Sequence, residues 1–266
     1  MKKILVSLLF YLTITPIFGQ LKINCSDKVS DSKLYKLPHS NFYSKNIEVF
    51  DQEIFLSIGG GIFLPKDSIW ILKPSINRQI ISFAINHTDS SLIVLQKIDT
   101  LLELTIIKLK QNSSSEKLSK KICTIEKGNY SLFYKNSTLF VWGYSNGNYK
   151  IGSLNNGKIV WLLSMNKKIT AIDLDYRNHL LLSMNNKIVD YNDSKVLVKC
   201  DTTIQGFSCI TDGTYLISCS SGLYKCQKGN SILIANGLFG ALRFLRNEIY
   251  LLSTSKSYLW CLKIKQ

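Results

Sequence analysis

The sequence predicts an all-β fold: a single β-propeller of six blades, each built of four antiparallel strands. Three observations lead to this fold class. Segments repeat at a spacing of 35 residues, each copy consists of short alternating apolar and polar runs separated by turn residues, and helical spacing is not sustained after residue 20. Repeats of this length with four strands each are typical of propeller blades.

The repeat is clearest in the second half of the chain. Three copies, which begin at Ile169, Ile204 and Phe239, align without a gap. The aligned positions include three leucines, three serines, two tyrosines and two cysteines: Leu181, Leu216 and Leu251; Ser183, Ser218 and Ser253; Tyr215 and Tyr250; Cys226 and Cys261. Self-similarity of this kind indicates a repeat architecture rather than a β-sandwich, which remains the alternative but requires no such repeat.

One copy shows how four strands are expected to follow one another. Residues 206–210 alternate, residues 211–213 are turn formers, and residues 214–219 are an apolar run. Residues 220–222 (Ser-Ser-Gly) form a tight turn, and two further runs, 223–226 and 231–235, complete the unit. Each unit therefore reads as one four-stranded antiparallel sheet.

The count of units leaves one strand missing. We expect blades at about 40–79, 80–128, 129–168, 169–203, 204–238 and 239–266. The last unit ends after its third strand, whereas residues 21–38 contain the strand-like runs LKINC and KLYKL. We predict that one of them is the fourth strand of the last blade, because this pairing would close the ring and remove an exposed sheet edge.

Residues 1–19 are predicted to be a secretory signal peptide, cleaved after Gly19 to leave residues 20–266. Lys2 and Lys3 precede an apolar run that Pro16 ends, the order typical of such peptides. The run is about 15 residues long, shorter than the roughly 20 that span a membrane, which argues against an anchor. We therefore expect a secreted or periplasmic monomer with no transmembrane segment after cleavage.

The charge balance argues against a nucleic-acid partner. The formal net charge is +15, yet only four of the 33 basic residues are arginine. Proteins that read nucleic acids rely on arginine forks for phosphate and guanine. A surplus made of lysine points to compositional bias, and we expect no nucleic-acid binding.

The lysines are unevenly distributed along the chain. Residues 104–168, in the predicted second and third blades, carry eleven lysines against two glutamates. A basic sector there could contact an anionic glycan or surface; the alternative is a solvated edge. The candidate anionic-partner patch comprises seven of them: Lys108, Lys110, Lys117, Lys120, Lys121, Lys127 and Lys135.

Catalytic and metal-binding patterns are weak. Propeller enzymes place acids on the inner strands, where we find Ser82, Ser131, Asp173, Ser208 and Arg243. The pair Asp173 and Asp175 could hold a cation only weakly, since Ca²⁺ takes six to eight oxygens, and we expect a solvated pair near a turn. His179 has no evident orienting partner. We therefore predict no catalytic residue, no metal site and no cofactor.

Seven cysteines leave the disulfide pairing open. Export would permit disulfides, and the odd number leaves at least one cysteine without a partner in the chain. The turn at 220–222 places Cys219 opposite Leu223 and Cys226 opposite Leu216, so that a bridge between these two cysteines would be strained.

The repeat resembles the two-component regulator propeller type of exported bacterial proteins and sensor ectodomains. The resemblance rests on an apolar pair followed by serine and then by glycine and an aromatic residue two positions later, as in Leu216-Ile217-Ser218 with Gly222-Leu223-Tyr224. It covers most of residues 40–266. It implies a propeller whose face binds a ligand or a partner.

We expect an exported, non-catalytic propeller that acts as a protein- or glycan-binding or scaffold module, with an unknown protein or an anionic glycan or surface as its partner. The alternative is a propeller hydrolase or lyase with a central cation. That alternative requires several inward-facing acids, of which the sequence indicates few.

Overall fold

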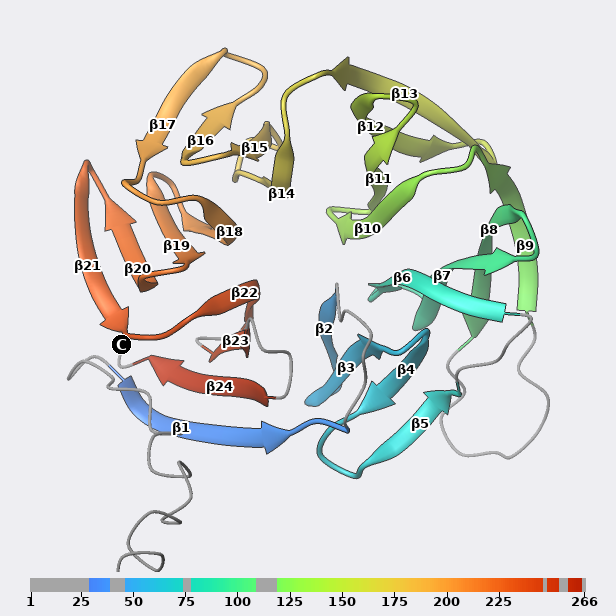
Figure 1. Cartoon of the computed structure of the whole chain (residues 1–266), viewed down its shortest axis with the longest axis horizontal. Helices are drawn as coiled ribbons and strands as arrows, with labels where there is room; N and C mark the ends of the chain where they lie inside the picture. The colour runs from blue at the N-terminus through green and yellow to red at the C-terminus, as the bar shows by residue number, and fades with distance from the viewer. Residues whose placement is uncertain are drawn as a thin grey trace, which may run out of the picture.

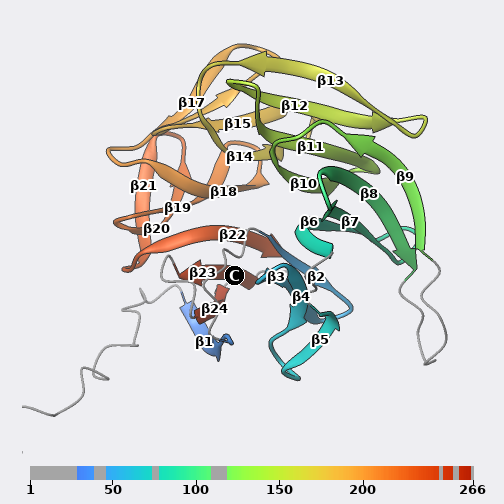
Figure 2. The same cartoon turned by 45° about the vertical axis from the view of Figure 1, so that its right-hand side comes forward.

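The chain folds into a ring of six four-stranded antiparallel sheets, a six-bladed β-propeller (Figure 1). This computed structural model describes residues 29–38, 46–73, 78–108, 119–245, 248–253 and 258–264. The described residues form no helix. In each blade the strands follow one another outward from the ring axis, as the turned view of β10 to β13 also shows (Figure 2).

Blades one to three are formed by β2 (Ile47–Phe50), β3 (Glu53–Ile58), β4 (Gly61–Leu64) and β5 (Ile69–Leu72); β6 (Arg78–Asn86), β7 (Ser91–Ile98), β8 (Leu101–Lys108) and β9 (Ser119–Ile125); and β10 (Asn129–Lys135), β11 (Thr138–Ser145), β12 (Asn148–Asn155) and β13 (Lys158–Met165).

Blades four to six are formed by β14 (Ile169–Leu174), β15 (Leu180–Met184), β16 (Lys187–Asp190) and β17 (Lys195–Lys199); β18 (Ile204–Thr211), β19 (Thr214–Cys219), β20 (Gly222–Gln227) and β21 (Asn230–Ala235); and β22 (Phe239–Leu245), β23 (Glu248–Ser253) and β24 (Tyr258–Ile264), completed by β1 (Val29–Lys36).

The N-terminal strand closes the ring, as predicted. Strand β1 pairs antiparallel with β24, from Val29 opposite Ile264 to Lys36 opposite Tyr258, and the two lie side by side in Figure 1. Most of β1 is exposed to solvent. Its attachment therefore depends on backbone hydrogen bonds, on the partly buried Val29 and Tyr35, and on Leu37, which directly follows the strand and is buried between blades six and one.

The core is divided among the contacts between blades. Six clusters of buried apolar side chains lie between neighbouring blades, one for each junction of the ring. Between blades four and five, for example, Leu181 and Ile188 pack against Phe207 and Ile217. Alternating residues on each strand therefore face the preceding and the following blade, which explains why central strands are apolar on both faces.

The repeated serine joins the second strand of a blade to its inner strand. Ser218 is fully buried on β19, opposite a bulge at Gly206. Its hydroxyl lies 2.6 Å from the carbonyl oxygen of Gly240 in the next blade and 3.2 Å from that of Gly206. In blade four the aligned Ser183 bonds to Thr170 at 2.8 Å. The serine recurs because it satisfies polar groups where the inner strand bulges.

The repeated tyrosine and cysteine are cross-strand partners. Tyr215 lies opposite Cys226, and Tyr250 lies opposite Cys261. The expected register of this hairpin is wrong, because the turn contains only two residues, and Cys219 therefore pairs with Gly222. The expectation that Cys219 and Cys226 do not face one another still holds. The cysteines in the described part of the chain form no disulfide.

Several predictions fall on residues 1–28, which are not among those described. They include the signal peptide, its cleavage after Gly19 and the strand-like run LKINC. Within the described ranges, no helix is long and apolar enough to cross a membrane.

We predict that Ser218→Ala destabilises the ring by about 1–3 kcal/mol, because the partly buried carbonyl of Gly240 loses its hydroxyl donor. For a domain of this size the melting temperature should fall by roughly 2–10 °C. Thermal unfolding followed by circular dichroism measures this change. Ser164→Ala, on the exposed side of β13, is the matched control and should leave the melting temperature within about 1 °C; equal losses in both variants would contradict the role of Ser218.

Candidate functional site

Polar side chains join the inner strands of blades one to three around the ring axis. The hydroxyl of Ser82 donates to Oδ1 of Asn46 at 2.5 Å and accepts the backbone N–H of Leu132 at 2.8 Å. Nδ2 of Asn46 donates to the carbonyl of Leu132 at 3.0 Å. These bonds hold β2, β6 and β10 together and satisfy groups that are buried from water.

Asp173 joins the inner strands of blades three, four and five. Its carboxylate accepts a bond from Nζ of Lys135 at 2.6 Å and from the backbone N–H of Cys209 at 2.8 Å. Asp173 is 3% exposed, so the expectation of a solvated acid is wrong. A buried carboxylate needs a counter-charge, and the neighbouring blade supplies it through Lys135.

A further acid, Glu48, joins blade one to blade six. Its Oε2 lies 2.9 Å from Nη2 of Arg243, and its side chain is buried. Burial raises the pKa of Glu48, and the positive charge of Arg243 and its hydrogen bond lower it only in part. Arg243 could be placed on an inner strand from the sequence, whereas Glu48 could not, because β2 has only four residues and shows little alternation.

A second charged cluster lies at the turns of blade four. Asp175, His179 and Asp190 bring one potential ligand atom each within 4.8 Å of one another, a spacing that could hold a metal ion. The guanidinium of Arg177 lies at the same place, with Nε 3.0 Å from Asp175 and Nη2 3.1 Å from Asp190. Arg177 therefore supplies the positive charge that a cation would otherwise provide.

The cluster also changes the interpretation of two residues. Asp175 is buried rather than solvated, and its Oδ1 accepts the backbone N–H groups of Arg177 and His179, both at 2.8 Å. Nδ1 of His179 lies 3.0 Å from Oδ2 of Asp190, so His179 does have an orienting partner. Sequence reasoning missed this pair because it depends on the contact between two different turns of one blade.

Asp173 and Asp175 lie at the opening of the ring on one of its two faces. A cavity of about 750 Å³ is lined there by residues of the turns that connect first and second strands, among them Lys135, Asp173, Tyr176 and Arg243. Three acids bear on it, Asp173 and Asp175 directly and Glu48 through Arg243, and each is held by a basic side chain. The arrangement provides hydrogen-bonding groups and the exposed ring of Tyr176.

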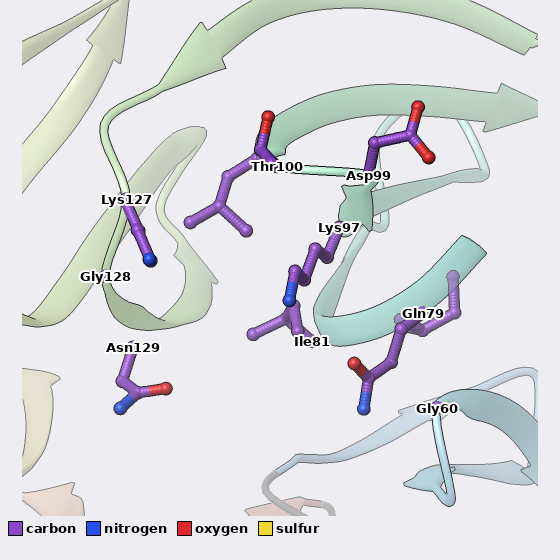
Figure 3. A pocket seen from close by; sticks show the side chains of 11 residues that line it. Gly60, Gln79, Ile81, Lys97, Asp99, Thr100, Lys127, Gly128 and Asn129 are labelled. Atoms are coloured by element: carbon purple, nitrogen blue, oxygen red, sulfur yellow. The ribbon is translucent and has the colours of Figure 1, made fainter. Parts of the chain in front are cut away.

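A second cavity, of about 460 Å³, opens on the opposite face between blades two and three (Figure 3). Consecutive strands run antiparallel, so the turns between second and third strands lie at this face. Gly60 and Asp99 belong to such turns, and Lys127 precedes the inner strand of blade three. Lys97 and Lys127 direct their amino groups into the cavity (Figure 3).

Three lysines of the predicted anionic-partner patch are neutralised. Lys108 pairs with Asp89 at 2.9 Å, and Lys121 pairs with Glu103 at 2.5 Å. Lys135 pairs with Asp173, in the cavity of about 750 Å³ at the opening of the ring. Exposed pairs of this kind contribute little to stability, but they cancel the local charge that the patch was expected to present.

The other patch lysines lie apart from one another. Lys120 is exposed on the outer strand β9, and Lys127 lines the cavity of Figure 3, at the opposite end of β10 from Lys135. Neither forms an ion pair with a described residue. Lys110 and Lys117 lie outside the described ranges. The tertiary structure thus brings Lys127 into the same cavity as Lys97. Lys97 was not part of the predicted patch, because it precedes the lysine-rich segment 104–168.

No family model matches the sequence, and no curated protein matches it. Solved structures share its fold. A chain of the nidogen/laminin complex is similar with a TM-score of 0.59 and 10% identity, over 80% of this chain and 89% of that chain. The β-propeller domain of Cps50 (Swd1) from Myceliophteria thermophila is similar with a TM-score of 0.51 and 9% identity, over 90% and 99%.

A third structure is the extracellular domain of the putative hybrid two-component system BT4673 from B. thetaiotaomicron, with a TM-score of 0.53 and 11% identity, over 86% of this chain and 39% of that chain. The six four-stranded sheets of the ring confirm the predicted six-bladed propeller, and these proteins share its general fold. At these identities the likeness is one of fold, and function must be argued from the site.

We predict that Glu48 makes the ring less stable as the pH rises. A pKa raised in the folded state contributes stability below the unfolded value, and that contribution is lost as the pH rises through the folded value. Between about pH 5 and pH 8 the wild type should therefore lose stability relative to Glu48→Gln, which carries no charge at this position. Denaturant unfolding of both proteins across this range measures the difference, and parallel curves would contradict it.

Proposed function

We propose that this protein is an exported, non-catalytic binding module that holds a protein or glycan partner on a face of the propeller. The observation that carries the proposal is the engagement of the acids around the ring axis. Asp173 is bound by Lys135 and a backbone N–H, Glu48 by Arg243, and Asp175 by Arg177. An acid in such a pair is held as a structural group, whereas general acid–base work needs a carboxyl that faces the substrate.

The rigidity of the ring supports the same proposal. Its inner strands are cross-linked by buried polar bonds, and its turns present two cavities on opposite faces. Binding residues are commonly carried by loops on a rigid scaffold, since a preformed surface loses little conformational entropy when a partner docks.

The alternative of a propeller hydrolase or lyase with a central cation makes a different prediction. A cation bound tightly to the folded ring would stabilise it by about 2.7 kcal/mol at a hundred times its dissociation constant. We expect millimolar Ca²⁺ to change the melting temperature of the wild type by less than about 1 °C, and ester, lactone and pectate substrates to remain intact. A larger shift, or turnover that Asp173→Asn abolishes, would favour the enzyme instead.

Export is tested at the N-terminus. We expect the protein recovered from the periplasm or medium of its producing cell to begin at Gln20, since the small residue Gly19 follows the apolar run of the predicted signal peptide. Intact mass spectrometry of the recovered chain measures the cleavage site. A chain that keeps residues 1–19 and stays inside the cell would contradict the predicted export.

A further inference from the structure

The cavity of Figure 3 has one wall that the pairing of three strands builds. Gln79 lies opposite Lys97 across β6 and β7, and Lys97 lies opposite Leu102 across β7 and β8. Cross-strand partners point to the same face of a sheet, so these three side chains form a row. Leu102 packs toward blade three, and Gln79 lies against the turn of blade one at Gly60. All three line the cavity.

The floor of the cavity is apolar because the inner strand bulges there. The register of β6 against β7 shifts between Ile80 and Ser82, which leaves Ile81 as the extra residue. A bulge redirects a side chain that regular pleating would place elsewhere. Ile80 and Ile81 therefore both line the cavity, with Leu102 beside them.

Two amino groups enter the cavity without a counter-ion. Neither Lys97 nor Lys127 forms an ion pair with a described residue. Asp99 turns its carboxylate away from both (Figure 3). Glu126, next to Lys127, instead accepts a bond from Lys150 at 2.7 Å and from the hydroxyl of Tyr130 at 3.0 Å. The cavity thus concentrates positive charge that the surrounding structure leaves available.

Backbone and amide groups complete the lining. Gly60 and Gly59 have positive φ, 84° and 57°, and form the two-residue turn between β3 and β4. A side chain at Gly60 would meet Gln79 at 2.9 Å, so glycine lets blade one approach the cavity closely. The amides of Gln79 and Asn129 offer donors and acceptors beside the lysines (Figure 3).

The lining favours one class of ligand. Its eleven residues include no aromatic side chain, so a sugar would lack the flat surface on which its ring commonly packs. An apolar floor beside two ammonium groups and two amides instead suits a carboxylate attached to an apolar group and a peptide backbone. The volume of about 460 Å³ lies within the range of small-ligand sites, roughly 300–1,000 Å³.

We propose that this cavity binds the C-terminal end of a partner polypeptide whose last residue is apolar. The inference rests on the proposed binding function and specifies its partner. Lys97 and Lys127 hold the terminal carboxylate, Ile81 and Leu102 contact the last side chain, and Gln79 and Asn129 bond to the peptide backbone. Each group thereby meets a ligand group of complementary chemistry.

The first test uses the wild-type protein alone. A fluorescent library of hexapeptides ending in leucine or isoleucine is titrated by fluorescence polarisation, once with free C-terminal carboxylates and once as C-terminal amides. We expect saturable binding of the acids and binding of the amides that is weaker by roughly tenfold or more, because the amides lack the charge that the lysines hold. Equal binding of acids and amides, or no binding at millimolar protein, would overturn the proposal.

The second test uses variants with the same change in charge. Lys97→Glu/Lys127→Glu should abolish binding of the acids. Lys187→Glu/Lys199→Glu is the matched control, because these two exposed lysines are cross-strand partners on blade four, far along the chain from the cavity, and it should bind as the wild type does. Circular dichroism establishes that both variants are folded. Equal binding by both variants would place the site elsewhere and sink the proposal.

A third arm separates this inference from the proposed function. Tetragalacturonate, a carboxylated sugar, is titrated into the same proteins. If it binds and the peptides do not, the cavity serves an acidic glycan; the peptide proposal then fails while the binding function stands. If the protein instead turns over a substrate, the binding function itself fails, whatever the cavity holds.

Discussion

The pairing of β1 with β24 is the contact on which the rest of the ring depends. It joins residues more than 220 positions apart, from Val29 with Ile264 to Lys36 with Tyr258. Without it the last blade would have three strands and an exposed edge. It also brings Leu37 into the cluster between blades six and one. Because every blade packs on two neighbours, closing this one junction fixes the position of all six.

A belt of polar contacts follows the same circuit around the axis. Asn46 and Ser82 join blades one to three, Asp173 joins blades three to five, Ser218 joins blades five and six, and Glu48 with Arg243 returns to blade one. Each contact satisfies a group that burial would otherwise penalise. The belt thus commits these polar side chains near the axis to structure, whereas the two cavities open at the faces of the ring.

The distribution of charge has the same logic. The chain carries a net charge of +15, but many of its lysines in blades two and three are paired with acids, as Lys108 and Lys121 are. In the proposed binding site, positive charge comes from lysines whose neighbouring acids are engaged elsewhere. Lys127 stays available because its neighbour Glu126 bonds to Lys150 and Tyr130. Local pairing, rather than the density of lysines along the chain, decides where positive charge reaches a ligand.

The sequence by itself determined the ring. The 35-residue repeat, with Ser183 and Ser218 at equivalent places, reports a local requirement that recurs in each blade, and the missing strand at the C-terminus required a partner from the N-terminus. Only the tertiary structure decided the sites. The fold joins residues from different blades, turns or strands. It pairs Glu48 with Arg243 and His179 with Asp190, and it places Lys97 in the same cavity as Lys127. Such contacts depend on which residues of different strands and turns lie side by side in the ring, and a register shift of one residue would turn a side chain to the other face of its sheet.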